Sequence, residues 1–359
     1  MIFLISLCIA LIFSLLCSDV LRKKPLPFYL GAALISLFCA VSVWKGIVFS
    51  DFFNTFVFPI FARGALAGAL FVIVMYAGVF VPGSFGAKAF MPVRAQLSII
   101  ACILTFGHNI AYGKTYFKML FTDSGEMQTG TLIAAVCSLV LIVIMLPLFI
   151  TSFKAVRKKM NGKSWKKLQR LAYVFYFLLF AHVMLLTVPR AIMGAEGYDL
   201  TVFVYGFVFI SYFLCRIIKA LYKNDKEKAV HRQMIAVSVA LLIATLFVGT
   251  ISSASSSSSI ASEGYSSYSY KDGTYSGEGM GNNGKINVDV TVKDGNIDAI
   301  AITKFLEDEE YFDVSVDGET MIERVIDAQG TDIDGISGAT YSSEGFILAV
   351  ESALEKARQ

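Results

Sequence analysis

The sequence contains 359 residues, of which 56% are apolar and 16% are charged, and its mean hydropathy is +0.64. The polar residues are too few to cover so much apolar surface, which excludes a chain that is soluble throughout. Residues 1–251 carry 24 Lys and Arg against 8 Asp and Glu, whereas residues 271–359 carry 7 against 19. This asymmetry indicates two bodies in different surroundings.

All six cysteines lie in apolar stretches before residue 216, and no two have the CxxC spacing. That pattern argues against iron–sulfur ligation and against a redox dithiol. We interpret the thiols as small buried hydrophobes. The acidic C-terminal region has no cysteine and must fold without disulfides.

The basic N-terminal region contains eight apolar stretches of about the 20 residues that a membrane span needs. They are 2–21, 26–44, 64–83, 93–113, 129–151, 168–188, 200–221 and 230–250. The stretch 45–63 is interrupted by polar residues and by proline, which favours an interfacial segment. The sequence therefore predicts an all-α membrane bundle of about eight spans.

The loops predict the orientation of this bundle. The loop 152–170 holds eight Lys and Arg and no acid, and residues 216–232 hold six basic groups, whereas the loop 114–128 balances two lysines with two acids. Basic loops face the cytoplasm. An even number of spans then places both termini, and the acidic region, outside the cytoplasm. The first span lacks a basic segment before it, so we expect a retained helix rather than a cleaved signal peptide.

Two of the three histidines, His108 and His182, fall within predicted spans. An ionisable side chain in a membrane is costly and suggests a function. Imidazole is a common axial ligand of haem held between helices. The alternative is a pair of core histidines bonded to Ser, Tyr or backbone, and the residues alone leave both interpretations open. His231 lies in a basic loop beside Arg232 and is interpreted as a solvated or interfacial residue.

The sequence around these histidines resembles a known family. Val93-Arg-Ala-Gln-Leu-Ser…Gly107-His108-Asn and Trp165-Lys-Lys-Leu-Gln-Arg-Leu-Ala-Tyr…Ala181-His182 are similar to the two haem-bearing helices of the ferric reductase-like transmembrane family. The resemblance implies a six-helix core over residues 26–222, with His108 and His182 as ligands of a haem iron. Residues 1–25 and 223–251 are then additional transmembrane helices.

One departure from that family concerns its second haem. The family often has another histidine 13 or 14 residues earlier on each ligand helix, where this chain has Arg94 and Gln169. We therefore predict one haem b. Because fourteen residues of helix span about 21 Å, electrons must enter from a donor in the membrane, either a quinol or an inner flavin near Arg94. The alternative for Arg94 is an interfacial side chain that reaches lipid phosphates.

Residues 252–270 have eleven serines in nineteen positions, a composition that predicts a flexible tether. Residues 271–359 then read as a compact α+β domain. Strands over 286–292 and 297–303 are joined by a tight Asp-Gly turn. One helix ends at Gly330, and a last helix begins with a Ser342 or Ser343 cap.

The run Asp334-Gly-Ile-Ser337-Gly338-Ala339-Thr340 precedes that last helix. Gly338 and Ala339 allow backbone to approach a bulky ligand. Thr340 lies where helix N–H groups stabilise a phosphate, and the hydroxyls of Ser337 and Ser342 can bond phosphate oxygens. The alternative is a tight turn that binds nothing.

A longer match surrounds this run. Lys271-Asp-Gly-Thr-Tyr-Ser-Gly-Glu-Gly, Val-Asp-Val-Thr-Val, Asp-Gly-Asn-Ile and Asp-Ile-Asp-Gly-Ile-Ser-Gly-Ala-Thr-Tyr-Ser-Ser follow one another in the order of the FMN-binding domain. The domain resembles the FMN-bearing subunits of Na⁺-pumping NADH:quinone reductase and Rnf complexes. The resemblance implies that Asp334, Ser337, Gly338, Ala339 and Thr340 form the recognition motif of a flavin transferase, and that Thr340 carries FMN through a phosphoester.

Together these resemblances predict a multi-pass electron-transfer flavohaemoprotein of the bacterial cytoplasmic membrane. Electrons would pass from the membrane donor through one haem to FMN and on to an extracytoplasmic acceptor. An alternative is a haem-free anchor that presents the FMN domain as a redox carrier or sensor for a partner complex. A transporter subunit is less favoured because no acidic residue lies deep in a span. We expect no nicotinamide site on this chain and no nucleic-acid partner.

Overall fold

The computed structural model describes residues 2–50, 52–192, 197–257, 270–307, 312–336 and 339–358. It divides into two compact units. The helical unit comprises residues 1–117 and 137–258. The sheet unit comprises residues 118–136 and 259–359. We describe each unit by itself.

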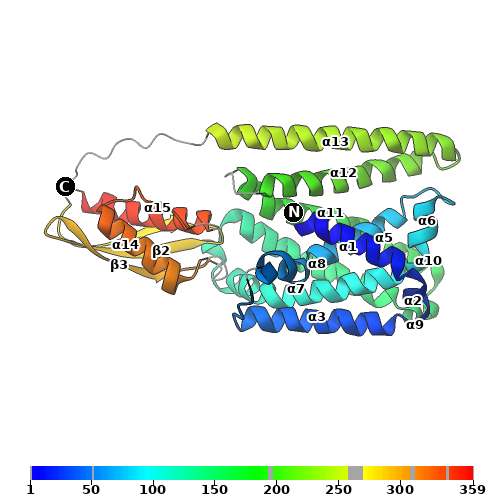
Figure 1. Cartoon of the computed structure of the whole chain (residues 1–359), viewed down its shortest axis with the longest axis horizontal. Coiled ribbons are helices and arrows are strands. Elements are labelled where there is room, and N and C mark those ends of the chain that lie inside the picture. Colours follow the sequence, from blue (N-terminus) through cyan, green and yellow to red (C-terminus); the bar gives the residue numbers. More distant parts are fainter. Residues whose placement is uncertain are drawn as a thin grey trace. The chain divides into compact units, whose positions relative to one another are not determined.

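The chain of the helical unit is almost entirely helical, because long apolar segments satisfy their backbone hydrogen bonds internally. Its elements are α1 (Ile2–Leu16), α2 (Ser18–Lys23), α3 (Leu26–Trp44), the π-helix Phe53–Val57, α4 (Phe58–Ala62), α5 (Ala65–Ala77), α6 (Phe85–Phe90), the 3₁₀ turn Met91–Val93, α7 (Arg94–Thr122), α8 (Thr129–Ser152), α9 (Lys154–Lys159), α10 (Gly162–Gln169), α11 (Leu171–Ile192), α12 (Tyr198–Leu221) and α13 (Lys226–Ser257). The last turns of α7 and the first of α8 belong to the sheet unit. Figure 1 shows α12 and α13 lying side by side.

Within the described residues, six helices are long and apolar enough to cross a membrane. A seventh span is possible if the bent pair formed by Phe53–Ala62 and Ala65–Ala77 counts as one. Helix α1 has only 15 residues, fewer than the roughly 20 that a span needs. The structure thus confirms a multi-span helical bundle, and the expected total of eight spans stays a prediction.

Two segments differ from their expected form. The stretch predicted to be interfacial ends in α4, which meets α5 at an angle of 47°. Helix α7 continues to Thr122, so the two lysines of the predicted loop 114–128 lie on a helix. No proline or glycine in the last two turns stops that helix earlier.

Helix α5 forms the centre of the helical unit. Eleven of its 13 residues are buried, as expected of a helix surrounded by others rather than by lipid. It packs against α1 and α12, and its Phe71 ring meets the Phe175 ring of α11 at 4.9 Å. A left-handed residue, Gly64 with φ +75°, separates α5 from α4, a conformation that glycine adopts at little cost.

The sheet unit contains an antiparallel sheet of three strands in the order β1 (Gly273–Met280), β2 (Lys285–Lys293) and β3 (Asn296–Lys304). The predicted turn between β2 and β3 is confirmed: Asp294 and Gly295 have φ of 52° and 76°, as a tight hairpin requires. Alternate residues of β2 are buried, namely Ile286, Val288, Val290 and Val292. One face of the sheet is therefore a core.

Two helices complete this core. Helix α14 (Glu319–Ala328) contacts β3, and α15 (Thr340–Ala357) contacts β1 and β2. Close packing of α15 depends on Gly277 and Gly279, because a Cβ on either would lie about 2 Å from a carbonyl oxygen of α15. The two predicted helix boundaries were off by a few residues. Helix α14 ends at Ala328 and is capped by Gln329, whose φ is 49°, and α15 begins at Thr340 rather than after Ser342 or Ser343.

The predicted tether lies mostly outside the described residues. Helix α13 reaches Ser257, so it includes the first six positions of the segment 252–270. At the other end, Tyr270 pairs with Arg358 and the Lys271 N–H donates to the Ala357 carbonyl at 2.8 Å. The sheet unit thus joins its own two ends.

Candidate functional site

His108 projects from α7 toward the break between α4 and α5. Its Nδ1 lies 3.0 Å from the carbonyl oxygen of Ala62. Because a carbonyl only accepts, the proton of a neutral ring must sit on Nδ1, which leaves a lone pair on Nε2. A backbone carbonyl that fixes the tautomer in this way is the usual support of a histidine that binds a metal.

The break itself makes room for the His108 ring. A Cβ on Gly64 would approach His108 Cγ to 3.3 Å, a tight contact for a residue that is also left-handed. The Ala62 carbonyl is the last of α4, where helix carbonyls lack an intrahelical partner. The bend at Gly64 therefore turns an unused acceptor toward the ring.

His182 lies on α11, and its Nδ1 is 3.3 Å from the hydroxyl of Ser138 on α8. The hydroxyl is able to accept from or donate to the ring, so this contact does not fix the tautomer. Among the described residues, no three or more His, Cys, Asp or Glu side chains form a group able to hold a bare metal ion. A haem needs fewer protein ligands than a bare metal ion, since the porphyrin supplies four ligands to the iron and the protein supplies only the axial ones.

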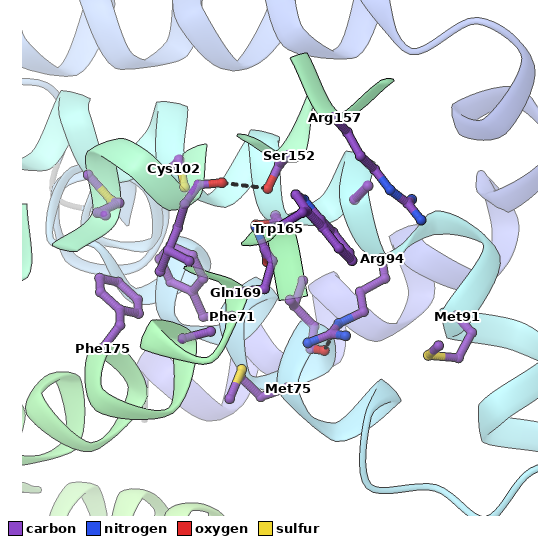
Figure 2. Close-up of a pocket in the computed structure, with 16 residues that line it drawn as sticks. Phe71, Met75, Met91, Arg94, Cys102, Ser152, Arg157, Trp165, Gln169 and Phe175 are labelled. Atoms are coloured by element: carbon purple, nitrogen blue, oxygen red, sulfur yellow. Dashed lines mark hydrogen bonds between the residues drawn. The ribbon is translucent and has the colours of Figure 1, made fainter. Parts of the chain in front are cut away.

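A cavity of about 250 Å³ lies elsewhere in the helical unit, between α5, α7, α8, α10 and α11. It brings together Arg94 and Gln169, the two residues that stand where the related family has further histidines. Figure 2 shows Arg94 and Trp165 toward one side of this cavity and Phe71 and Phe175 toward the other. The cavity is therefore polar at one end and aromatic at the other.

Hydrogen bonds orient the polar end. Arg94 Nε donates to the Val74 carbonyl at 2.8 Å. Gln169 Nε2 donates to Thr151 Oγ1 at 3.1 Å, and Trp165 Nε1 donates to the Thr151 carbonyl at 3.1 Å. Thr151 thus positions two lining side chains that sequence reasoning did not connect.

The charge of the cavity is one-sided. The guanidinium of Arg157 lies 4.4 Å from the centre of the Trp165 ring, and Arg94 lies nearby on the wall. No Asp or Glu is among the described residues that line the cavity. Two cations without a carboxylate partner favour an electron-rich or anionic ligand.

In the sheet unit, Thr340 is exposed and is the first residue of α15. The preceding Ala339 is buried and provides no side-chain cap. Thr340 therefore lies at the N-terminus of an 18-residue helix, a position whose backbone N–H groups and dipole favour phosphate. Ser337 and Gly338 lie outside the described residues.

The two serines after Thr340 are used within the protein. Ser343 Oγ accepts from the Ile336 N–H at 2.9 Å. Ser342 Oγ donates to Glu307 Oε2 at 2.7 Å, and a contact of Ser342 with a phosphate stays a prediction. Both hydroxyls hold the start of α15 in place.

Two charged residues near the motif were missed from the sequence. Arg324 of α14 donates through Nη1 to the carbonyls of Asp334 and Gly335, the second at 3.3 Å, and thereby anchors the exposed Asp334. Glu307 is buried, and burial raises its pKa while its hydrogen bonds lower it. Arg324 is the single cation of α14, and Glu307 begins a run of four acidic residues, 307–310.

Comparison with known proteins places both regions in families. Residues 63–180 match the ferric reductase like transmembrane component, and residues 281–355 match the FMN-binding domain. The first range contains Arg94 and His108 and ends two residues before His182. An uncharacterized protein of Treponema pallidum (strain Nichols) is 34% identical over 340 residues, which is 94% of each chain. No solved structure matches the chain.

Proposed function

We propose a function from one premise: this chain belongs to a protein family that joins a ferric reductase-like transmembrane component to a C-terminal FMN-binding domain. It is a transmembrane electron-transfer flavoprotein. We further propose the electron route: electrons pass from a donor in the membrane through one b-type haem to FMN on Thr340, and on to an acceptor outside the cytoplasm. The observation that carries it is the His108–Ala62 bond, since it leaves the ligand nitrogen available in the component that matches ferric reductases.

The residues fit a haem in two ways. His108 presents Nε2 in the neutral tautomer, and Gly64 places no side chain against its ring. His182 has a hydroxyl at Nδ1 that is able to take the same supporting role. When bound, a haem would supply one-electron transfer, and His108 and His182 would hold its iron.

We propose that the cavity around Arg94 receives the head group of a quinol. At about 250 Å³ it is smaller than the roughly 300–1,000 Å³ of most ligand pockets, which favours a compact ring over a whole flavin. Arg94 and Arg157 favour the oxygen that gains electron density as a quinol loses its proton. Phe71 and Phe175 offer aromatic surface to the ring.

In the sheet unit, the Thr340 hydroxyl would lose its proton and its oxygen would bond to the phosphorus of FMN, displacing the group to which the transferase's flavin donor joins that phosphate. The exposed position of Thr340 gives a flavin transferase access, and the N-terminus of α15 stabilises the phosphate charge. FMN, when attached, accepts and stores electrons. A covalent bond also keeps the flavin from diffusing away outside the cell.

The test uses full-length protein produced together with a flavin transferase. The wild type is expected to gain the mass of one FMN and to show b-type Soret and α bands. Thr340→Ala should lose the mass increment and keep the bands, whereas His108→Ala should lose the bands and keep the increment. His231→Ala is the matched control, because His231 is exposed, and it should change neither quantity.

Other results lead elsewhere. Wild-type protein with FMN but without haem bands would refute the electron route and leave the anchor that presents an FMN domain. Protein without the mass increment would refute the covalent flavin. Non-covalent flavin released from the Thr340→Ala protein would assign the Arg94 cavity to a flavin instead of a quinol.

A further inference from the structure

The sheet unit includes a segment that is far from it in sequence, residues 118–136, which we name the docking segment. It bonds to the turn 282–284 between β1 and β2. Thr131 Oγ1 donates to the Asn282 carbonyl at 3.0 Å, and the Gln128 N–H donates to the Asn283 carbonyl at 2.9 Å. Met127 forms a β-bridge with Gly284. These contacts recognise the backbone of one turn over three consecutive residues.

Apolar side chains surround these bonds. Met119, Met127 and Ala135 of the docking segment are each 5% exposed and pack with Leu306, which follows β3. The approach is close at Gly284, where a Cβ would lie 2.8 Å from the backbone oxygen of Glu126. The contact therefore excludes water and needs glycine at its centre.

A charged group lies beside the apolar contact. Lys304, the last residue of β3, forms ion pairs with Glu126 and, at 3.6 Å, with Asp123. Its hydrogen bond to Glu126 raises the pKa of Lys304. All three side chains are about one-third exposed, so the pairs add modest energy and are weakened by salt. These ion pairs therefore serve mainly to select the partner and to fix its register.

The recognised turn is also linked to the start of α15. Glu307 accepts from the three N–H groups of residues 282–284 at 2.8 to 3.2 Å. The same carboxylate accepts from Ser342 Oγ at 2.7 Å. Ser342 lies in the first turn of α15, two residues after Thr340. One buried carboxylate thus joins the turn that contacts the docking segment to the helix turn that carries Thr340.

We propose that residues 118–136 are a specific docking site for the C-terminal domain of the same chain, and that Lys304 is the charged residue that selects it. The docking segment includes the last residues of α7, the helix that carries His108. Because both partners belong to one chain, their effective concentration is high and a small interface suffices. The proposal concerns position alone and holds whether or not haem is bound.

The test is zero-length carbodiimide cross-linking of the full chain in native membranes, followed by mass spectrometry of the linked peptides. We expect a peptide that joins Lys304 to Glu126 or Asp123. The pair Lys285–Glu278, at 2.9 Å within the sheet, is the internal control and should be linked in every variant. A mixture of light and heavy isotope-labelled protein tells links within one chain from links between copies.

Variants of the charged group sharpen the result. Lys304→Glu should reduce the 304–126 link to background, and Lys304→Glu combined with Glu126→Lys should restore it. Gly284→Ala should reduce the link without changing any charge. The proposal is overturned if the control pair is linked while Lys304 is not, or if the Lys304 link joins two different copies.

Discussion

Gly277→Ala tests how the sheet unit holds the helix that begins with Thr340. Gly277 lies on β1 where α15 approaches most closely. An added Cβ would lie 2.0 Å from the Ala349 carbonyl oxygen and 2.6 Å from the Ala353 nitrogen. Both atoms are helix backbone, so no side-chain rotation relieves the contact and the whole helix must move.

The size of the effect follows from that displacement. A Cβ is essentially never found within 3.0 Å of another heavy atom, so α15 must retreat by roughly 1 Å, which forfeits about a quarter to a half of each contact's attraction. Helix α15 buries Phe346, Val350 and Leu354 almost completely. Overpacking usually costs about 1–3 kcal/mol. We expect the upper end, about 3 kcal/mol, which corresponds to roughly 100-fold in an opening equilibrium.

Hydrogen exchange of the β2 amides in the full-length protein measures this change, because those amides are released when the sheet unit opens. Gly330→Ala is the matched control, since its added Cβ would meet nothing closer than 3.8 Å, and its β2 protection should equal that of the wild type. Attachment of FMN to Thr340 should fall in the Gly277 variant alone. If Gly277→Ala kept β2 protection within about threefold of wild type, the close packing of β1 on α15 would not be what holds the unit together.

Three further predictions concern residues that support the site. Gly64→Ala introduces a Cβ at a left-handed position, which costs about 1–2 kcal/mol, and this Cβ would lie 3.3 Å from the His108 ring. Haem absorbance per protein should therefore fall below that of the wild type. Unchanged absorbance would contradict the assignment of His108 as a haem ligand. Burial raises the pKa of Glu307 above its ordinary value of 4.5. The stability that Glu307 contributes is therefore fully present below pH 4.5 and is lost as the pH rises through the raised pKa. Hydrogen-exchange protection of β2 should decline over this rise in pH in the wild type but not in Glu307→Gln. Thr151→Val removes the acceptor of the Gln169 amide, and in quinol-driven reduction KM should rise several-fold with little change in kcat; a change in kcat alone would argue against a role in donor binding.

The elements of the sheet unit that depend on local sequence could be predicted. The Asp294-Gly295 turn follows from the two residues that tolerate positive φ, and β2 follows from its alternation. The start of α15 was misplaced because Ser342 and Ser343 look like caps. Their hydroxyls instead serve Glu307 and the Ile336 N–H, contacts that join distant parts of the sequence.

In the helical unit too, features that depend on local sequence could be predicted and features that depend on distant contacts could not. Apolar length was sufficient to predict a multi-span bundle, because the hydrophobic span is a local property. The sequence separated the stretch 45–63 from the span 64–83, but it did not predict the left-handed conformation of Gly64, since nothing in the neighbouring residues requires it. Its reason is the His108 ring, 44 positions later in the sequence. A side chain that needs space thus determines the backbone of another helix.

Residues that take part in the chemistry can therefore be identified from the sequence, whereas the contacts that orient them are seen only in the structure. His108, Arg94 and Thr340 stand out in the sequence because imidazole, guanidinium and hydroxyl groups are conspicuous in an apolar span or a glycine-rich run. Their supports are the Ala62 carbonyl for His108, the Val74 carbonyl for Arg94, and, for Thr340, the buried Glu307 carboxylate that accepts from Ser342 two residues later. Backbone carbonyls carry no sequence signal at all. Only tertiary structure reveals that each reactive group is held by a contact, and the strength of that contact decides whether the group is in position when its cofactor arrives.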